Sequence, residues 1–209
     1  MTVITKPRPG RIFKNEFLES LTKSSPRISI SFYTLIIFFF VYLSHQFTSL
    51  NIVQASCFYV AGIVLWTLIE YFLHRYVFHI DEYFPVLKRF HYIFHGVHHE
   101  NPRDHDRLFM PVIAGTIIAS FLTAVFYFFF GRHAFPLMAG ISSGYVVYAY
   151  IHYTIHTRPG KLYFHQLWIN HLKHHYKHPD KAFGVSSPFW DIVFKTTPPE
   201  NSGETRHFS

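Results

Sequence analysis

Cysteine is almost absent from this 209-residue sequence, and charged side chains are scarce. The single cysteine, Cys57, excludes an intramolecular disulfide framework and zinc sites built from four thiolates. Charged residues make up only 15% of the chain, which is low for a soluble domain. The first 27 residues are polar and lack the apolar core of a cleavable signal peptide. These shortages argue against a secreted or soluble globular protein.

Acidic residues are also in the minority, with 12 Asp and Glu against 19 Lys and Arg and a formal net charge of +7. Such a balance can indicate nucleic-acid binding. Here, however, the basic residues lie beside apolar runs rather than in a continuous stripe with stacking aromatic residues. We therefore expect no nucleic-acid partner, and we attribute the charge to membrane topology.

The sequence is instead rich in apolar residues, and aromatic residues alone supply 20% of it. A helix needs about 20 apolar residues to cross a bilayer. Four runs meet this requirement: Ile28 to Gln46, Ile52 to Leu73, Leu108 to Phe130, and Ala134 to Ile155. The connectors within the first and second pairs are long enough only for tight turns. We therefore expect an all-α integral membrane protein with four transmembrane helices arranged as two antiparallel hairpins.

The distribution of basic residues predicts the orientation of these helices. Six Lys and Arg residues precede Ile28, five lie between His74 and Arg107, and seven follow His156, whereas only Arg132 lies on the opposite side. By the positive-inside rule, the basic face is cytoplasmic. We expect a multi-pass protein of a bacterial inner membrane or the endoplasmic reticulum, with a cytoplasmic N-terminal segment at 1–27 and a membrane domain at 28–209.

Histidine is the compositional outlier, with 17 residues that are bunched rather than spread. Ten of them fall in four clusters on the predicted cytoplasmic face. The clusters are His74 and His79; His95, His98 and His99; His152 and His156; and His171, His174 and His175. A lone histidine near a membrane surface is usually an interfacial polar residue, but four spaced clusters on one face indicate metal binding.

Helical geometry predicts how the clusters present their imidazoles. Positions i, i+3 and i+4 lie on one helical face, so we expect the HxxHH motif at His171 to aim three imidazoles at one point and the HxxxH motif at His152 to aim two. His74 and His79 are five residues apart, which requires a helix break or two different metals. Two metals with about five ligands each use ten imidazoles, whereas one ion takes no more than about six. We therefore predict a dinuclear site in a cytoplasmic helical cap.

An all-imidazole site favours oxidation over hydrolysis. Neutral imidazole suits iron, zinc, copper and nickel. No histidine follows Glu100 at the spacing of an HExxH motif, so a membrane zinc peptidase loses its main support. Iron that reacts with oxygen beside a lipid fits oxidation of an unactivated C–H bond. A membrane metal transporter is the alternative of another class, although its ligands should lie near mid-span rather than crowd one end.

The clusters and their surroundings resemble the fatty acid hydroxylase superfamily, and within it the fatty acid 2-hydroxylases. The similarity runs from about Trp66 to Thr196 and includes WTLIEY before His74, HYTIH at His152, and HLKHH followed by FGVSSPFWDIVFKT. The element HGVHHENPRDHDRLFMP, which begins at His95, is more similar to the 2-hydroxylase branch than to sterol C-4 methyl oxidases or carotene hydroxylases. Sterol- or carotenoid-type oxidases and desaturases of the same superfamily are the alternatives among enzymes.

The resemblance implies oxygen-dependent hydroxylation of a fatty acyl chain at C2, in a free fatty acid or a sphingolipid. It also implies that the ten clustered histidines bind two metal ions, with iron expected and zinc also suited to these ligands. Many members carry a cytochrome b5 domain, whereas only about 27 polar residues precede the first apolar run here. We therefore expect an external electron-donor protein, such as a cytochrome b5 or a ferredoxin.

Four further residues are candidates for orienting the imidazoles. Glu70, Asp104 and Asp191 are acidic residues near a cluster, and His91 lies four residues before His95 on the same helical face. For the three carboxylates, the alternative is a surface or interfacial salt bridge. No catalytic residue beyond the metal ligands is predicted.

Overall fold

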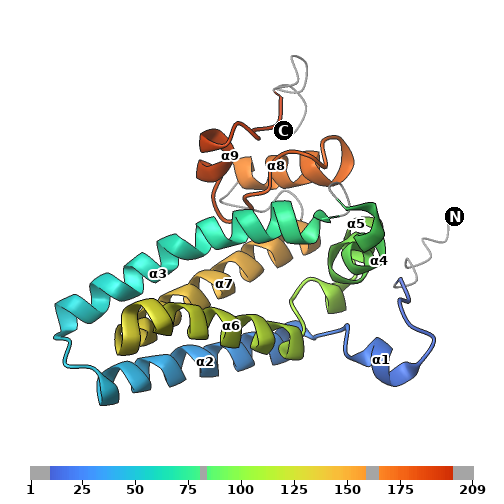
Figure 1. The fold of residues 1–209 in the computed structure, drawn as a ribbon. Coiled ribbons are helices and arrows are strands. Elements are labelled where there is room, and N and C mark those ends of the chain that lie inside the picture. Colours follow the sequence, from blue (N-terminus) through green and yellow to red (C-terminus); the bar gives the residue numbers. More distant parts are fainter. Residues whose placement is uncertain (1–9, 81–83, 159–164, 200–209) are drawn as a thin grey trace, which may run out of the picture.

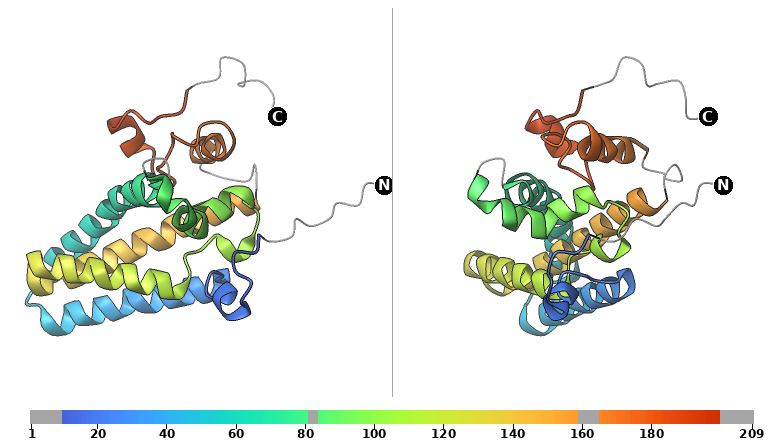
Figure 2. Two further views of the ribbon diagram at one scale, coloured as in Figure 1. Left: turned by 45° about the vertical axis from the view of Figure 1, so that its right-hand side comes forward. Right: turned by 90° about the vertical axis from the view of Figure 1, so that its right-hand side faces the viewer.

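The computed structural model describes residues 10–80, 84–158 and 165–199, and the regular elements in these ranges are all helical (Figure 1). The four long helices are α2 (Pro26–Phe47), α3 (Ile52–Phe72), α6 (Val112–Phe130) and α7 (Ala134–Thr157). They form a bundle in every view (Figures 1 and 2). Their bounds lie within a few residues of the four apolar runs seen in the sequence.

Local sequence signals fix the ends of these helices. Ser25 caps α2 by accepting a hydrogen bond from the amide nitrogen of Ile28. Asn51 and Gln54 form a reciprocal capping box at the start of α3. Gly131 ends α6 with a φ of 54°, a conformation that glycine adopts without strain, and the 3-10 turn Gly131–His133 leads into α7.

Helix α7 packs closely against α3 because glycine occupies both sides of the contact. A Cβ atom at Gly62 would lie 2.2 Å from the carbonyl oxygen of Leu137, and one at Gly140 would lie 2.0 Å from that of Tyr59. Small residues allow this approach of two backbones in membrane helices. The position of α7 beside α3 brings the ends of both helices, where histidines lie, to the same part of the molecule.

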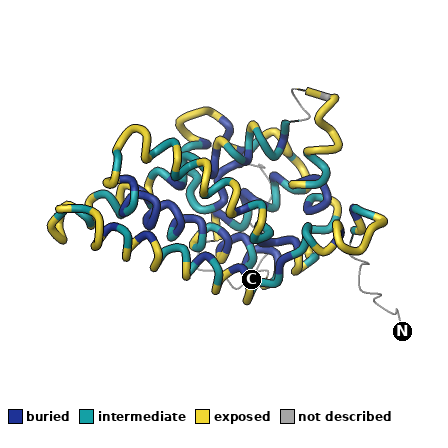
Figure 3. Tube along the Cα trace, turned by 60° about the horizontal axis from the view of Figure 1, so that its bottom comes forward, coloured by how far each residue is buried: buried dark blue, intermediate teal, exposed yellow. Residues whose placement is uncertain are grey.

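The outer faces of the bundle are exposed and apolar. Buried residues lie along the inside of the bundle and exposed residues lie on its outward faces (Figure 3), and the side chains of Phe38 and Phe128 are 65% and 82% exposed. Within the described ranges, three helical stretches are long and apolar enough to cross a membrane: Pro26–Phe47, Ile52–Phe78 and His105–Thr157. The third stretch is 53 residues long and contains both α6 and α7. This is the surface expected of a protein surrounded by lipid.

The shorter elements gather at the end of the bundle where α3 and α7 terminate (Figure 2). They are the π-helices Leu73–Phe78 and Tyr92–Gly96, the 3-10 helices Pro85–Leu87 and His105–Arg107, and α4 (Lys88–His91), α5 (Val97–Glu100), α8 (His165–Tyr176) and α9 (Phe189–Val193). All four histidine clusters lie in or beside this region.

The N-terminal segment packs onto the loop that precedes α6. It contains the short helix α1 (Glu16–Ser20). Arg107 of the loop forms an ion pair with Glu19 at 2.5 Å and donates to the hydroxyl of Thr22 at 2.8 Å. Both charged side chains are less than 10% exposed. The N-terminal segment is therefore fixed beside the histidine region by a buried ion pair.

Candidate metal centre

A π-helix places His74 and His79 together. Its wider turn is closed by a hydrogen bond of 3.2 Å from the amide nitrogen of His79 to the carbonyl oxygen of His74. In a regular α-helix, residues five apart point in different directions, but the i to i+5 turn of a π-helix brings them towards one face. Of the two alternatives that the spacing left open, the helix irregularity is present as a π-helix, and both imidazoles join the same group.

The three-histidine motifs divide between two groups, so the expectation that HxxHH aims three imidazoles at one point is wrong. The i, i+4 pairs each stay together: His95 with His99, His152 with His156, and His171 with His175. The remaining histidines, His98 and His174, occupy the i+3 positions and turn to the other group. Positions i+3 and i+4 diverge by about 100° around the helix axis, so one motif can reach two points.

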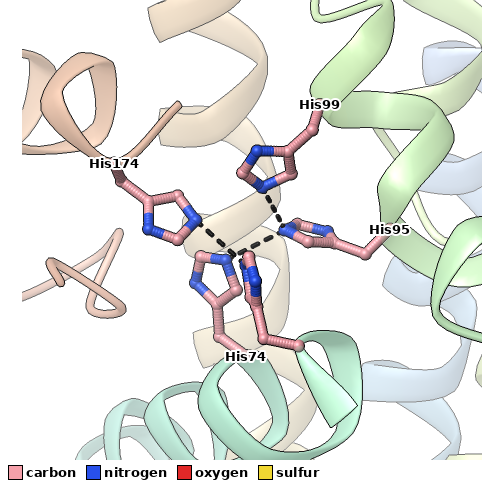
Figure 4. Close-up of side chains that lie close together, drawn as sticks. His74, His95, His99 and His174 are labelled. Carbon is pink, nitrogen blue, oxygen red and sulfur yellow. Dashed lines mark hydrogen bonds between the residues drawn. The ribbon is translucent and has the colours of Figure 1, made fainter. Parts of the chain in front are cut away.

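The ten clustered histidines therefore form two groups of five. The first histidine group contains His74, His79, His95, His99 and His174, and the second contains His98, His152, His156, His171 and His175. The candidate ligand nitrogens within each group all lie within 4.8 Å of one another. Figure 4 shows four members of the first group converging on one point. They come from the π-helix that follows α3, from the π-helix Tyr92–Gly96 and α5 next to it, and from α8. Each half of the chain gives four histidines to one group and one to the other.

The spacing of the ring nitrogens fits metal coordination. Pairs of Nε2 atoms lie 2.9 to 3.2 Å apart, as in His74 with His95, His95 with His99, His79 with His174, His98 with His152, His156 with His171, and His171 with His175. With metal–nitrogen bonds of about 2.1 Å, two ligands at right angles hold their nitrogens about 3.0 Å apart. Five such nitrogens around one point match a coordination sphere.

Backbone carbonyl groups orient three of the imidazoles. Nδ1 of His74 donates to the carbonyl oxygen of Phe183 and Nδ1 of His174 to that of Lys181, both at 2.7 Å. Nδ1 of His152 donates to the carbonyl oxygen of Leu108 at 3.3 Å. A proton on Nδ1 leaves the lone pair on Nε2, which faces the other nitrogens of its group. These contacts therefore prepare the rings to bind a cation.

Several of the clustered histidines lie outside the candidate membrane spans, and burial keeps their imidazoles in the neutral form. Loss of hydration lowers the pKa of His79 to about 2 and that of His99 to about 3, and positive charge on neighbouring histidines acts in the same direction. The same causes place the pKa of His95, His171 and His174 well below the ordinary value of 6.5. Neutral imidazole is the form that binds metals, so the protein supplies the ligands in the required state.

Glu70 and Asp191 bind the loop 183–186, which carries the carbonyl group that contacts His74. Glu70 accepts from the amide nitrogens of Val185 and Ser186 at 2.6 and 2.8 Å, and also from the hydroxyl of Ser186. Asp191 accepts from the amide nitrogens of Phe183 and Gly184 at 2.9 Å. The two buried carboxylates thus hold the loop that carries the carbonyl group bound to His74.

The other two candidates for orienting the imidazoles, Asp104 and His91, have different surroundings. Asp104 caps the 3-10 helix His105–Arg107 and pairs with Arg107 at 3.1 Å, so its carboxylate serves the fold of the loop. His91 donates from Nδ1 to the carbonyl oxygen of Phe78, and its ring lies 5.6 Å from the ring of His79. It therefore packs beside the first histidine group without belonging to it.

A mostly apolar cavity of about 170 Å³ adjoins both groups and is called here the outer cavity. Its wall includes His74 and His95 of the first group and His98 and His152 of the second. Apolar side chains from the loop 108–111, from α3 and α7, and from the two π-helices form most of the remaining wall. A molecule in this cavity would lie beside both histidine groups at once.

A second opening reaches the first histidine group from another direction. This open pocket, of about 740 Å³, is lined by His79 and His99 and also by Lys88 and Arg89. Glu100 also lines it, so the two basic residues against one carboxylate leave the pocket with an excess of positive charge. The first group is therefore accessible both from the apolar outer cavity and from a basic surface.

Comparison with known proteins identifies the family to which this chain belongs. The family model described as fatty acid hydroxylase matches residues 59–196. A ceramide very long chain fatty acid hydroxylase of Schizosaccharomyces pombe is 37% identical over 192 residues, which are 88% of this chain and 54% of the relative. A dihydroceramide fatty acyl 2-hydroxylase of Arabidopsis thaliana is 33% identical over 190 residues, 90% of this chain and 80% of the relative. The fatty acid 2-hydroxylase of Homo sapiens is 35% identical over 217 residues, 92% of this chain and 58% of the relative.

A solved structure has the same fold. It is that of full-length scs7p, in which only the hydroxylase domain is visible; it is 32% identical and superposes with a TM-score of 0.82 over 90% of this chain and 71% of that one. This chain spans only about half the length of the Schizosaccharomyces pombe and human relatives. Because the family model covers most of the chain and relatives above 30% identity align along nearly all of it, the chain belongs to the fatty acid hydroxylase family.

Proposed function

We propose that this protein is a membrane-bound monooxygenase that introduces a hydroxyl group at C2 of a fatty acyl chain. The observation that carries the proposal is the pair of five-histidine groups, each of which contributes two histidines to the wall of one mostly apolar cavity. The names of the relatives, which include fatty acid 2-hydroxylases and ceramide hydroxylases, support C2 as the position and a free fatty acid or sphingolipid as the substrate.

Each histidine group would hold one metal ion. Iron is the expected metal, because imidazole ligands suit it and the reaction requires a redox-active ion, while zinc also fits the ligands. Iron bound here supplies the activation of dioxygen. The chain's own contribution is to orient the rings of His74 and His174 through carbonyl groups, and to exclude water from the reacting carbon with the apolar wall of the outer cavity.

The overall reaction consumes dioxygen and two electrons. One oxygen atom enters the C–H bond at C2, and the other leaves as water after taking up two electrons and two protons. The electrons come from an external protein such as a cytochrome b5 or a ferredoxin. The pocket with Lys88 and Arg89 beside His79 and His99 supports an acidic donor, because opposite charges guide such partners to the surface nearest the metal ligands.

We place all four long helices across the membrane, with α6 and α7 as separate spans. Two antiparallel hairpins then bring the histidine region to one side, and the positive-inside rule assigns that side to the cytoplasm. In this arrangement residues 1–27 form a cytoplasmic segment and residues 28–209 the hydroxylase domain, in a bacterial inner membrane or the endoplasmic reticulum. An acyl chain enters from the bilayer while electrons arrive from the cytoplasm.

Lipid analysis of cells with and without the protein tests the proposal. With the wild type we expect accumulation of 2-hydroxy acyl lipids that carry oxygen from labelled dioxygen, and about two metal ions per purified chain. His98→Ala and His171→Ala, one from each half of the chain, should lose product by about 100-fold or more, whereas His133→Ala at the opposite end of the bundle should keep it. Full activity and unchanged metal content in both variants would refute the site.

The products formed distinguish the alternative functions. A new double bond would identify a desaturase, and an oxidised sterol methyl group or a hydroxylated carotenoid would identify a sterol- or carotenoid-type oxidase. Metal flux without oxygen consumption would identify a transporter.

A further inference from the structure

A smaller cavity of about 40 Å³ lies deeper in the helix bundle and is called here the inner cavity. All four long helices contribute to its wall, for example through Tyr33, Trp66, Ala119 and Met138. The described residues that line it include no charged side chain and no histidine. Its surroundings therefore suit a hydrocarbon and offer nothing to an ionic group.

The inner and outer cavities share a wall. Trp66, Leu73, Met110 and Tyr145 line both of them. The rings of Trp66 and Tyr145 meet edge to face, with centroids 5.4 Å apart, and Met110 is an unbranched side chain that changes rotamer readily. The four shared residues place the two apolar cavities next to each other.

Hydroxylation at C2 determines how the acyl chain is oriented relative to the histidine groups. If C2 lies beside the histidine groups, the carbonyl end of the acyl chain lies there too, and the remaining methylene groups extend away from it. The outer cavity receives the first of these groups. The inner cavity is the next apolar space on the side away from the histidines, so it is suited to the methyl end.

The inner cavity is bounded where α2 and α6 touch. A Cβ atom at Gly115 would lie 1.7 Å from the hydroxyl oxygen of Tyr33, so the tyrosine fills the space that a side chain would need. The ring of Tyr33 also lies against that of Tyr145, with centroids 4.3 Å apart. Ala119 follows Gly115 by one helical turn, and the small size of its side chain leaves room within the wall.

We infer that the inner cavity binds the methyl end of the acyl chain and that Ala119 sets the longest chain that the enzyme accepts. The inference rests on the proposed hydroxylation for the placement of the carbonyl end. A larger residue at position 119 would fill the inner cavity and leave the histidine groups and the outer cavity unchanged.

Substitution on two faces of α6 tests the role of Ala119. Ala119→Phe fills the inner cavity, and Ala119→Val fills part of it. Ala124→Phe introduces the same ring at an exposed position of the same helix and is the matched control.

The measurement is turnover of a graded series of saturated acyl chains. We expect Ala119→Phe to lower turnover of the longest chains about tenfold or more relative to the shortest. Ala119→Val should have a smaller effect in the same direction, and Ala124→Phe should match the wild type. Chain-length profiles of both Ala119 variants that match the wild type would overturn the inference.

Photocrosslinking gives a readout that does not depend on turnover. A fatty acid with a diazirine at its methyl end should label residues around the inner cavity on α6 and α7 in the wild type and in Ala124→Phe, and this labelling should be lost in Ala119→Phe. Labelling confined to outward-facing positions such as Ile117 and Phe121, and unaffected by Ala119→Phe, would overturn the inference. Labelling of the inner cavity without hydroxylated product would support it and refute the proposed function instead.

Discussion

Nδ1 of His74 lies 2.7 Å from the carbonyl oxygen of Phe183, and contacts of this kind are distributed unequally between the two histidine groups. The first group has a second contact of equal length, from His174 to Lys181. The second group has one, from His152 to Leu108, at 3.3 Å. Among the described residues, Nδ1 of His98, His171 and His175 has no hydrogen-bond partner although each atom is buried.

This inequality predicts that the second group releases its metal first. An imidazole that binds metal through Nε2 carries a proton on Nδ1, and outer hydrogen bonds to such ligands are typically worth about 10- to 100-fold in metal affinity. A chelator should therefore remove metal in two phases. His171→Ala, which damages the second group, should retain one slowly released ion, and His174→Ala should retain one that is released quickly. Release of both wild-type ions at one rate, or the reverse order in the variants, would contradict the prediction.

Asp191→Asn should weaken the first histidine group without removing a ligand. Burial raises the pKa of Asp191, and its carboxylate accepts from the amide nitrogens of Phe183 and Gly184 and from the hydroxyl of Thr196. The asparagine amide would turn an N–H group towards one of these donors. We expect a loss of about 1–3 kcal/mol in unfolding free energy and faster loss of one metal ion, measured by thermal unfolding and metal analysis.

The control for Asp191→Asn is Asp180→Asn in the same segment of the chain. The side chain of Asp180 is 63% exposed and lies 3.9 Å from Lys181. An exposed pair of this kind contributes little, so the control should retain stability and metal. Equal behaviour of the two variants would show that the loop is held by other contacts.

Glu19→Gln should release the N-terminal segment. It breaks a buried ion pair with Arg107 and leaves that guanidinium with Asp104 as its acidic partner, which typically costs about 1–3 kcal/mol. Glu16→Gln removes the exposed pair with Arg11 and should change stability by less than about 1 kcal/mol. Hydrogen exchange at residues 12–24 measures the difference, and equally slow exchange in both variants would argue against the ion pair as the attachment.

Acid should release the same segment in the wild type. Burial by itself raises the pKa of Glu19, but hydrogen bonds from the amide nitrogens of Phe13 and Ile12 and the charge of Arg107 outweigh it, so the pKa is lowered. A group with a lowered pKa stabilises the fold above its unfolded value, and this contribution is lost as pH falls below 4.5 through the folded value. Exchange at residues 12–24 should therefore accelerate in acid in the wild type, and Glu19→Gln should lack this pH dependence.

The metal-free protein should lose stability as pH falls below 6.5. The folded pKa values of His79 and His99, about 2 and about 3, lie below the ordinary 6.5, so the unfolded chain takes up protons that the folded chain does not. Each such histidine removes about 1.4 kcal/mol of stability per pH unit below 6.5. Thermal unfolding of chelated protein across this range measures the slope, and a flat profile would contradict the burial of neutral rings.

The sequence identifies the long helices and the ten histidines because both leave a side-chain signature. Apolar runs locate α2, α3, α6 and α7 to within a few residues. The grouping of the histidines leaves no such signature, since whether His98 joins His95 or His152 depends on how two helices face each other. The carbonyl groups of Lys181 and Phe183 are equally invisible in the sequence, because any residue type at those positions offers the same oxygen. The sequence singles out Glu70 and Asp191 as acidic residues near the clusters, but it shows neither their burial nor their backbone partners.

Each histidine group takes four ligands from one half of the chain and one from the other, so assembly of the metal sites depends on both halves being in the membrane. The first hairpin and its loop lack His174, and the second lacks His98, so neither can complete a coordination sphere while it is alone in the membrane. Metal uptake is therefore thermodynamically linked to the association of the two hairpins. A half-inserted polypeptide holds four ligands of one site and one of the other, and both sites are completed only when the walls that separate them from the surrounding lipid are in place.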